Sequence, residues 1–148
     1  DAITHTEQSN KRTEQLSQIL KHSHIPFQQV KDMHIWQLCH LGMVIPLADA
    51  YYQTENPESV GQDKVVMRKT AIQLKKNFNI LYENLNTLSL VKMHIFRYLP
   101  TSILIYILSQ TFKSSFGKKF MYQHSMKAPD EMRELHKQFY SYIKKWRL

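Results

Sequence analysis

Histidine and cysteine are the side chains in this 148-residue sequence whose chemistry can be judged first from spacing. A structural metal ion needs about four ligands that converge on one point. His22 and His24 fall at an expected helix end beside a proline turn. His34 and His40 are six positions apart, which places them on different sides of a helix. The eight histidines therefore predict no metal site.

The single cysteine, Cys39, lies within an uncharged apolar segment. A lone thiol excludes an intramolecular disulfide and points to a reducing compartment, so we expect a cytoplasmic protein. A nucleophilic cysteine would need a cationic, partly exposed setting, so we expect a buried, inert thiol. No Gly-x-Ser-x-Gly elbow supports Ser-His-Asp chemistry, and three scattered glycines form no phosphate cradle. The chain by itself is therefore not expected to bind a dinucleotide.

The formal charge of +8 raises the question of an acidic partner. Lysine and arginine clusters bind polyanions because they release condensed counterions. Five cations lie opposite the apolar positions of one expected helix, namely Lys64, Arg68, Lys69, Lys75 and Lys76. An ordinary solvated helix face has the same pattern, so both interpretations stay open.

The element most able to position a site is the segment 27–52, which has no charged residue between Asp32 and Asp49. It carries Pro46 near its middle and Gly42 four residues earlier. A proline inside a helix removes a backbone hydrogen bond and costs roughly 3 kcal/mol, so the segment predicts a helix bent near these residues. The alternative is a break between two ordinary core helices.

Apolar spacing predicts the remaining helices. The first two cover residues 13–22 and 63–85, the second with Asp63 as its N-cap. Two more cover residues 91–99, ending before Pro100, and residues 101 to about Gly117, with Thr101 as the cap. The last begins at Pro129 and has an apolar stripe of Met132, Leu135, Phe139, Ile143 and Trp146. Asn56-Pro57 and Gly61 predict a loop, and residues 103–107 alone would also suit a strand, although no partner strand is evident.

These elements predict an all-α fold with a single helical domain of about six helices, because no segment resembles a parallel sheet. Apart from the proline-bearing segment, the longest uncharged apolar run covers residues 99–112, which is shorter than the roughly 20 residues that span a bilayer, so we expect no membrane partner. The domain would cover residues 13–148, and residues 1–12 would be a polar junction tail following a missing N-terminal domain.

The order of these motifs resembles the C-terminal helical domain of the ketopantoate reductase (2-dehydropantoate 2-reductase) family, over about residues 13 to 143. The first matching segment contains Trp36, His40, Pro46, Leu47, Ala48, Ala50 and Tyr51, and the last contains His124, Glu131, Met132 and Leu135. The resemblance implies the fold of the C-terminal domain of 6-phosphogluconate-dehydrogenase-like reductases.

The resemblance also implies a function. This chain would be the substrate-binding and dimerisation domain of an NADP-dependent reductase of a small 2-keto acid, inactive alone. Its partners would be an N-terminal Rossmann domain of the same polypeptide, which would bind NADP, and a second copy of the chain. The alternative is a non-catalytic basic helical module that binds nucleic acid or another acidic partner.

One departure from the family pattern concerns catalysis directly. The family's catalytic lysine follows the tryptophan by two residues, but Gln37 and Leu38 follow Trp36 here. The family's asparagines are also missing, with Leu41 and Ile45 near their places. The resemblance therefore leaves the catalytic residues unknown and the reductase activity an open question.

Four residues remain as candidates for substrate binding. Glu131 matches a family glutamate that reaches the substrate's hydroxyl group, although an acid in a first helical turn is also favoured by the helix dipole. His124 and Ser125 would contact substrate or cap the last helix, and His40 would be a ligand-binding or a hydrogen-bonded core histidine. Together they would line a cleft facing the Rossmann domain.

Overall fold

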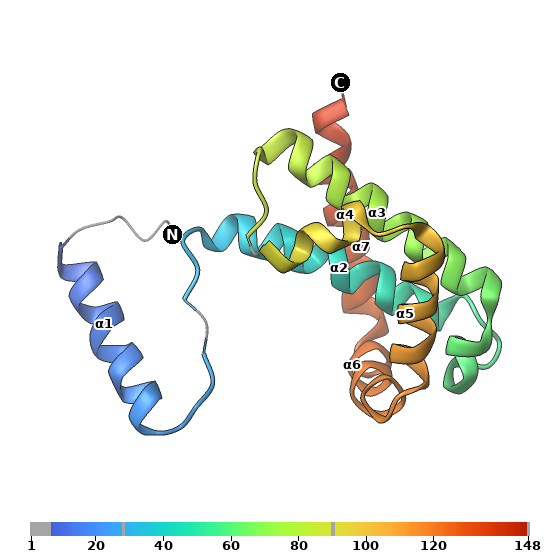
Figure 1. The fold of residues 1–148 in the computed structure, drawn as a ribbon, viewed down its shortest axis with the longest axis horizontal. Coiled ribbons are helices and arrows are strands. Elements are labelled where there is room, and N and C mark those ends of the chain that lie inside the picture. The colour runs from blue at the N-terminus through green and yellow to red at the C-terminus, as the bar shows by residue number, and fades with distance from the viewer. Residues whose placement is uncertain (1–6, 28, 90, 148) are drawn as a thin grey trace. The chain divides into compact units, whose positions relative to one another are not determined.

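The computed structural model describes residues 7–27, 29–89 and 91–147, and all the regular structure within these ranges is helical, which confirms the all-α prediction. The chain separates into two compact units, Asp1–Lys31 and Asp32–Leu148. Residues 13–31 therefore group with the N-terminal unit and not with the domain in which the sequence placed them (Figure 1).

The first unit contains helix α1, which spans Glu7–His22. The helix begins before the predicted Thr13, so residues 7–12 of the expected tail are helical, whereas residues 1–6 lie outside the described residues. Favourable helix formers such as Lys11 and Arg12 explain the earlier start. Its apolar residues Leu16 and Ile19 are exposed.

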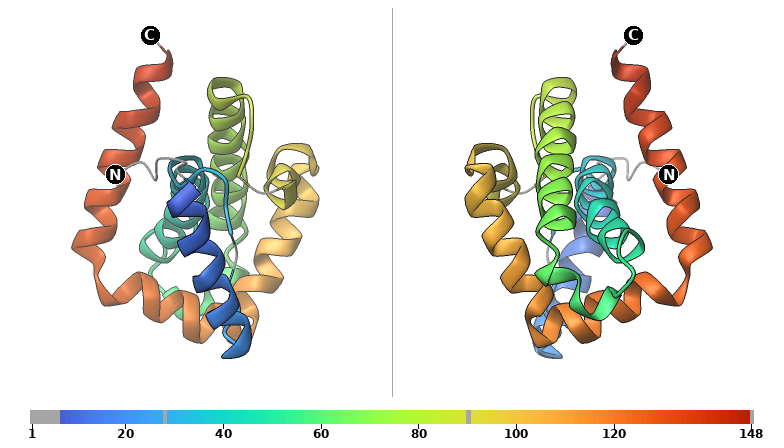
Figure 2. Two further views of the ribbon diagram at one scale, coloured as in Figure 1. Left: turned by 90° about the vertical axis from the view of Figure 1, so that its left-hand side faces the viewer. Right: turned by 90° about the vertical axis from the view of Figure 1, so that its right-hand side faces the viewer.

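The second unit is built around four longer helices, α2 (Met33–Tyr52), α3 (Lys64–Leu85), α5 (Thr101–Lys113) and α7 (Pro129–Lys144). Helix α2 packs against both α3 and α7, and α5 packs on another side of α3 (Figure 2). Their inward residues form one core that includes Cys39, Ile45, Met67, Leu74, Phe78, Leu81, Leu104, Phe112 and Phe139. Cys39 is completely buried, and burial raises the pKa of its thiol, as expected for an inert cysteine.

Helix α2 starts at Met33 because Asp32 caps it, accepting a hydrogen bond of 3.0 Å from the backbone N–H of Ile35. The helix continues through Pro46 to Tyr52, so the alternative of two separate core helices is wrong. Proline has no N–H, which leaves the carbonyl oxygen of Gly42 without its usual donor four residues later. The side-chain amide of Asn77 on α3 takes that place at 3.0 Å.

Gly42 also lies where side chains of α3 and α7 come close to the backbone of α2. A Cβ atom added there would lie 2.9 Å from Cδ1 of Leu81 and 3.5 Å from Cζ of Phe139. Both neighbours are fully or almost fully buried. The glycine thus permits the close packing of the three helices that surround the candidate site.

Helix α3 begins where predicted, since Asp63 accepts hydrogen bonds from Val65 and Val66. The predicted loop before it is partly a 3₁₀ helix, η1 (Pro57–Gln62). Lys75, expected on the solvated face, is instead half-buried and donates from Nζ to the carbonyl oxygens of Arg97 at 2.9 Å and Leu99 at 2.6 Å. These bonds fasten the end of the short helix α4 (Ile95–Tyr98) to α3, after the 3₁₀ turn η2 (Val91–His94).

Residues 103–107 are helical, which excludes the strand alternative, but α5 ends at Lys113 rather than near Gly117. Thr101 is its first residue and not its cap; Pro100 holds the N-cap position without a side-chain hydrogen bond. A π-helical turn, η3 (Phe116–Met121), and helix α6 (Tyr122–Lys127) follow. In this turn Gly117 packs directly against the backbone of α5, where no Cβ atom would fit.

Helix α7 has Pro129 at its start and Asp130 in its first turn, as predicted. Met132, Phe139 and Ile143 of the predicted stripe are buried, whereas Leu135 is 36% exposed at the edge of the stripe. A 3₁₀ turn, η4 (Lys145–Arg147), ends the described chain. Within the described ranges, no helix combines the length and the apolar character needed to cross a bilayer.

Candidate functional site

A pocket of about 550 Å³ opens between α2, α3 and α7. Its lining residues are Pro46, Asp49 and Gln53 from the end of α2, Lys69, Thr70, Ile72, Gln73 and Lys76 from α3, and His136 and Tyr140 from α7. We call this cavity the main pocket. Its walls therefore come from segments that lie far apart in the sequence, and its polar groups are of several chemical kinds.

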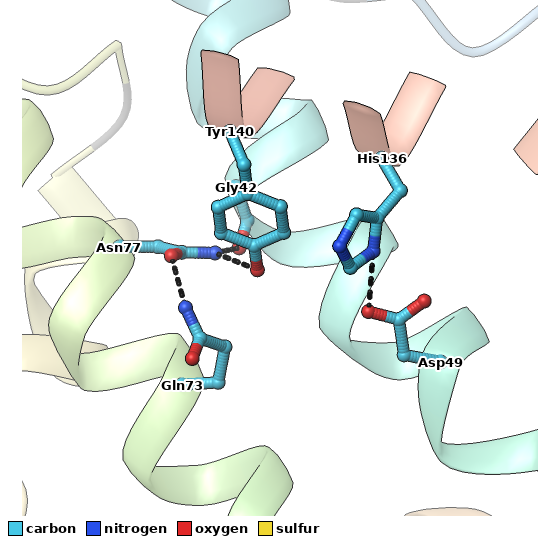
Figure 3. A network of polar contacts seen from close by, with 6 residues as sticks. All are labelled: Gly42, Asp49, Gln73, Asn77, His136 and Tyr140. Atoms are coloured by element: carbon cyan, nitrogen blue, oxygen red, sulfur yellow. Dashed lines mark hydrogen bonds and ion pairs between the residues drawn. The ribbon is translucent and has the colours of Figure 1, made fainter. Parts of the chain in front are cut away.

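The main pocket contains a hydrogen-bonded Asp–His pair (Figure 3). Nδ1 of His136 lies 2.9 Å from Oδ2 of Asp49, which joins α7 to α2. Burial raises the pKa of the Asp49 carboxyl, and the charge and hydrogen bond of His136 oppose this effect. With Nδ1 held by the carboxylate, Nε2 remains to give or accept a proton. Nε2 has no hydrogen bond to any residue that the structure describes.

A second polar network lies beside this pair and is centred on Asn77, which is completely buried (Figure 3). Its Nδ2 donates to the Gly42 carbonyl at 3.0 Å and to the Tyr140 hydroxyl at 3.3 Å, while its Oδ1 accepts from Nε2 of Gln73 at 2.8 Å. Burial raises the pKa of the Tyr140 hydroxyl. The Tyr140 and His136 rings lie 4.5 Å apart between centroids, so the network supports the wall that carries the imidazole.

Two ammonium groups add positive charge to the main pocket. Lys69 and Lys76 are exposed residues of α3 that line it. They lie seven positions apart, which places both on the same side of the helix. Asp49 is the single acidic residue among the described lining residues and is already bonded to His136. The pocket is thus suited to a small anion.

The four candidates from the sequence lie outside the main pocket. His40 stacks on Trp36, with ring centroids 4.9 Å apart. Burial lowers the pKa of His40, and the charge of the nearby His124 lowers it further, so these two histidines are neighbours. Ser125 is buried, and its carbonyl accepts a hydrogen bond from Tyr52.

The fourth candidate, Glu131, is exposed in the first turn of α7. The structure gives it no hydrogen bond or ion pair with the other three candidates, within the residues that are described. The main pocket is therefore a different cavity from the cleft that these four residues were expected to line. His40 and His124 are close enough for their charges to interact.

Sequence reasoning missed the residues that form the site, namely Asp49, Gln73, Asn77, His136 and Tyr140. Two signals were present. Asn77 is a polar residue within the apolar stripe of α3, directly before Phe78. His136 and Tyr140 are four residues apart and therefore share one face of α7. Neither signal names Asp49 as the partner, because that contact joins residues 87 positions apart.

The described residues do not form a metal centre, since no group of three or more His, Cys, Asp or Glu side chains converges among them. No glycine is among the residues that line the main pocket within the described part of the chain. Comparisons of the chain with protein-family models, curated proteins and solved structures found no match.

Proposed function

We propose that this chain is the substrate-binding domain of a ketopantoate-reductase-like oxidoreductase that reduces a small 2-keto acid. The observation that carries the proposal is the Asp49–His136 hydrogen bond within a pocket that also contains Lys69 and Lys76. Two of the three helices around the pocket, α2 and α7, carry segments that resemble that family, and α3 provides the third wall. The proposal includes a cytoplasmic homodimer and an NADP-binding Rossmann domain in the same polypeptide.

The lysines provide the carboxylate site. A 2-keto acid carries one negative charge at neutral pH, next to the carbonyl group to be reduced. An ammonium group near the substrate carboxylate gains Coulomb energy, and charge-assisted hydrogen bonds are about twice as strong as neutral ones. Lys69 and Lys76 both line the pocket, so either one or both hold the carboxylate there.

His136 provides the proton donor that the family's missing lysine would otherwise supply. When the C2 carbonyl is reduced, its oxygen gains electrons and must take a proton to become the hydroxyl group. The protonated imidazole of His136 gives that proton from Nε2, while Asp49 keeps the ring oriented and stabilises its positive charge. In this proposal the Rossmann domain supplies the hydride donor, and this chain supplies substrate binding and the proton.

Isothermal titration calorimetry tests the binding part. We expect 2-oxobutyrate to bind the chain and 2-oxobutanamide, which has no carboxylate, to bind at least about tenfold more weakly. The double variant K69Q/K76Q should lose this preference. The control K64Q/R68Q removes two exposed charges from the same helix outside the pocket and should keep it. Equal binding of acid and amide, or equal losses in both variants, would contradict the proposal.

The catalytic part needs the full-length polypeptide with its Rossmann domain. We expect His136→Ala to retain binding of 2-oxobutyrate but to slow NADPH oxidation by about 10²-fold or more. His34→Ala is a matched control, because His34 also bonds a side chain of α7 from α2 but lies outside the main pocket. A reading frame that encodes no dinucleotide-binding fingerprint would overturn the reductase assignment.

A further inference from the structure

A second pocket of about 180 Å³ continues the main pocket along α3 and α7. Gln73, Lys76 and Tyr140 line both pockets, so the two cavities lie next to each other, and we call them together the groove. We call the second cavity the side pocket. Its remaining lining residues are Asn77, Ile80, Ile143 and Lys144. The side pocket therefore offers a ligand contacts beyond those of the main pocket.

Positive charge is distributed along the whole groove rather than at one end. Lys69 lines only the main pocket, Lys76 lines both pockets, and Lys144 lines only the side pocket. Lys69 and Lys76 are separated by about 10 Å along α3, at 1.5 Å per residue. Among the described lining residues, Asp49 is the single acid, and its charge is already engaged by His136. The far end of the groove thus has a cation without an opposing carboxylate.

The side pocket also has apolar surface between its charged groups. Ile80 is 7% exposed and Ile143 is 4% exposed, so both present only a small part of their side chains to the cavity. These residues suit a short methylene chain, whereas Lys144 suits an anionic group at the end of that chain. The main pocket thus provides Lys69, Lys76 and His136, and the side pocket adds apolar side chains and Lys144.

We propose that the groove binds an elongated dianion, a 2-keto acid with a second carboxylate at the far end of its chain. The inference rests on the proposed function for the position of the first carboxylate and the keto oxygen. The first carboxylate lies near Lys69, the keto oxygen faces His136, and the second carboxylate lies near Lys144. Lys144 is thus a specificity residue that selects dicarboxylates over monocarboxylates.

Calorimetry on the full chain with a matched ligand pair tests this inference. The probes are 2-oxoadipate and 2-oxohexanoate, which have the same six-carbon chain and differ by one carboxylate. We expect 2-oxoadipate to bind about tenfold more tightly, the effect of one charge-assisted contact. Lys144→Gln should remove the preference by weakening the binding of 2-oxoadipate about tenfold. Lys137→Gln, an exposed lysine of α7 outside the groove, should preserve it.

The outcomes separate this inference from the proposed function. Equal affinities for the two ligands in the unmodified chain would overturn the dianion inference but leave 2-keto acid binding intact. Equal losses in Lys144→Gln and Lys137→Gln would also overturn it, because they would show a general charge effect. Failure of both ligands to bind would reject the proposed function as well. Thermal melting by circular dichroism confirms that each variant is folded before titration.

Discussion

The side-chain amide of Asn77 donates a hydrogen bond of 3.0 Å to the carbonyl oxygen of Gly42, the carbonyl that Pro46 leaves without its helical donor. A buried carbonyl without a partner costs about 1–3 kcal/mol, so this bond offsets much of the cost of a proline inside α2. It also joins α2 to α3 directly behind the candidate site. The contributions of Pro46 and Asn77 to stability should therefore depend on each other.

A double-mutant cycle tests this coupling between Asn77 and Pro46. We expect Asn77→Ala to lower the free energy of unfolding by about 2–4 kcal/mol, because it removes three hydrogen bonds and leaves a small cavity. In a Pro46→Ala background the same change should cost about 1 kcal/mol less, since the substituted alanine would restore a backbone N–H for the Gly42 carbonyl. Urea unfolding measures both values. Strictly additive effects would show that Asn77 does not serve the carbonyl freed by Pro46.

The pKa of Asp49 should depend on His136 and not on other histidines of the same interface. Burial raises this pKa above its ordinary value of 3.8, and the charge and hydrogen bond of His136 lower it. His136→Ala should therefore raise the pKa of Asp49 further. His34→Ala should leave it unchanged. Carbon-13 NMR of the aspartate carboxyl groups measures the titration in both variants.

The raised pKa of Asp49 should also make the stability of the fold depend on pH. A carboxyl whose pKa is raised on folding contributes stability below its unfolded pKa, and this contribution is lost as pH rises through the folded pKa. The free energy of unfolding of His136→Ala should thus fall more steeply above about pH 4 than that of the unmodified chain. Adding Asp49→Asn should remove the extra slope. If the free energy of unfolding of His136→Ala had the same pH dependence as that of the unmodified chain, the effect of His136 on the pKa of Asp49 would be contradicted.

Alanine at Gly117 should be more destabilising than alanine at Gly42. A Cβ atom at Gly117 would lie 2.3 Å from the carbonyl oxygen of Thr111, which is backbone and cannot rotate away. It would also displace the carbonyl that accepts a 2.8 Å hydrogen bond from Tyr51, whose burial raises its pKa to about 12. We expect a loss of about 3 kcal/mol or more at Gly117, against about 1–3 kcal/mol at Gly42.

Thermal and urea unfolding of the two alanine variants provide the comparison. At Gly42 the nearest atom belongs to the Leu81 side chain, which is buried but has rotatable bonds. Alanine there also gains about 1 kcal/mol of helix propensity. Equal destabilisation of the two variants would show that the π-helical turn adapts to a side chain at Gly117.

Much of the helical framework could be predicted from local chemistry. Asp63 caps α3 and Pro129 begins α7 because capping and fixed φ angles depend on neighbouring residues alone. The start of α2 was less predictable. The sequence analysis placed this element at residues 27–52, whereas the helix begins at Met33 after the cap Asp32. The end of α5 was misjudged because Gly117 packs against that helix instead of terminating it.

By itself, the sequence determined that this protein is all-helical and which apolar stripes of α3 and α7 face the core, because helical periodicity and capping act over a few residues. Only the tertiary structure decided that Asn77 serves α2, that Asp49 meets His136, and that Lys75 is fastened to α4. These contacts depend on helix register and crossing, which the packing of the whole core sets. The candidate pocket lies where the first two of these contacts join α2 to α3 and to α7.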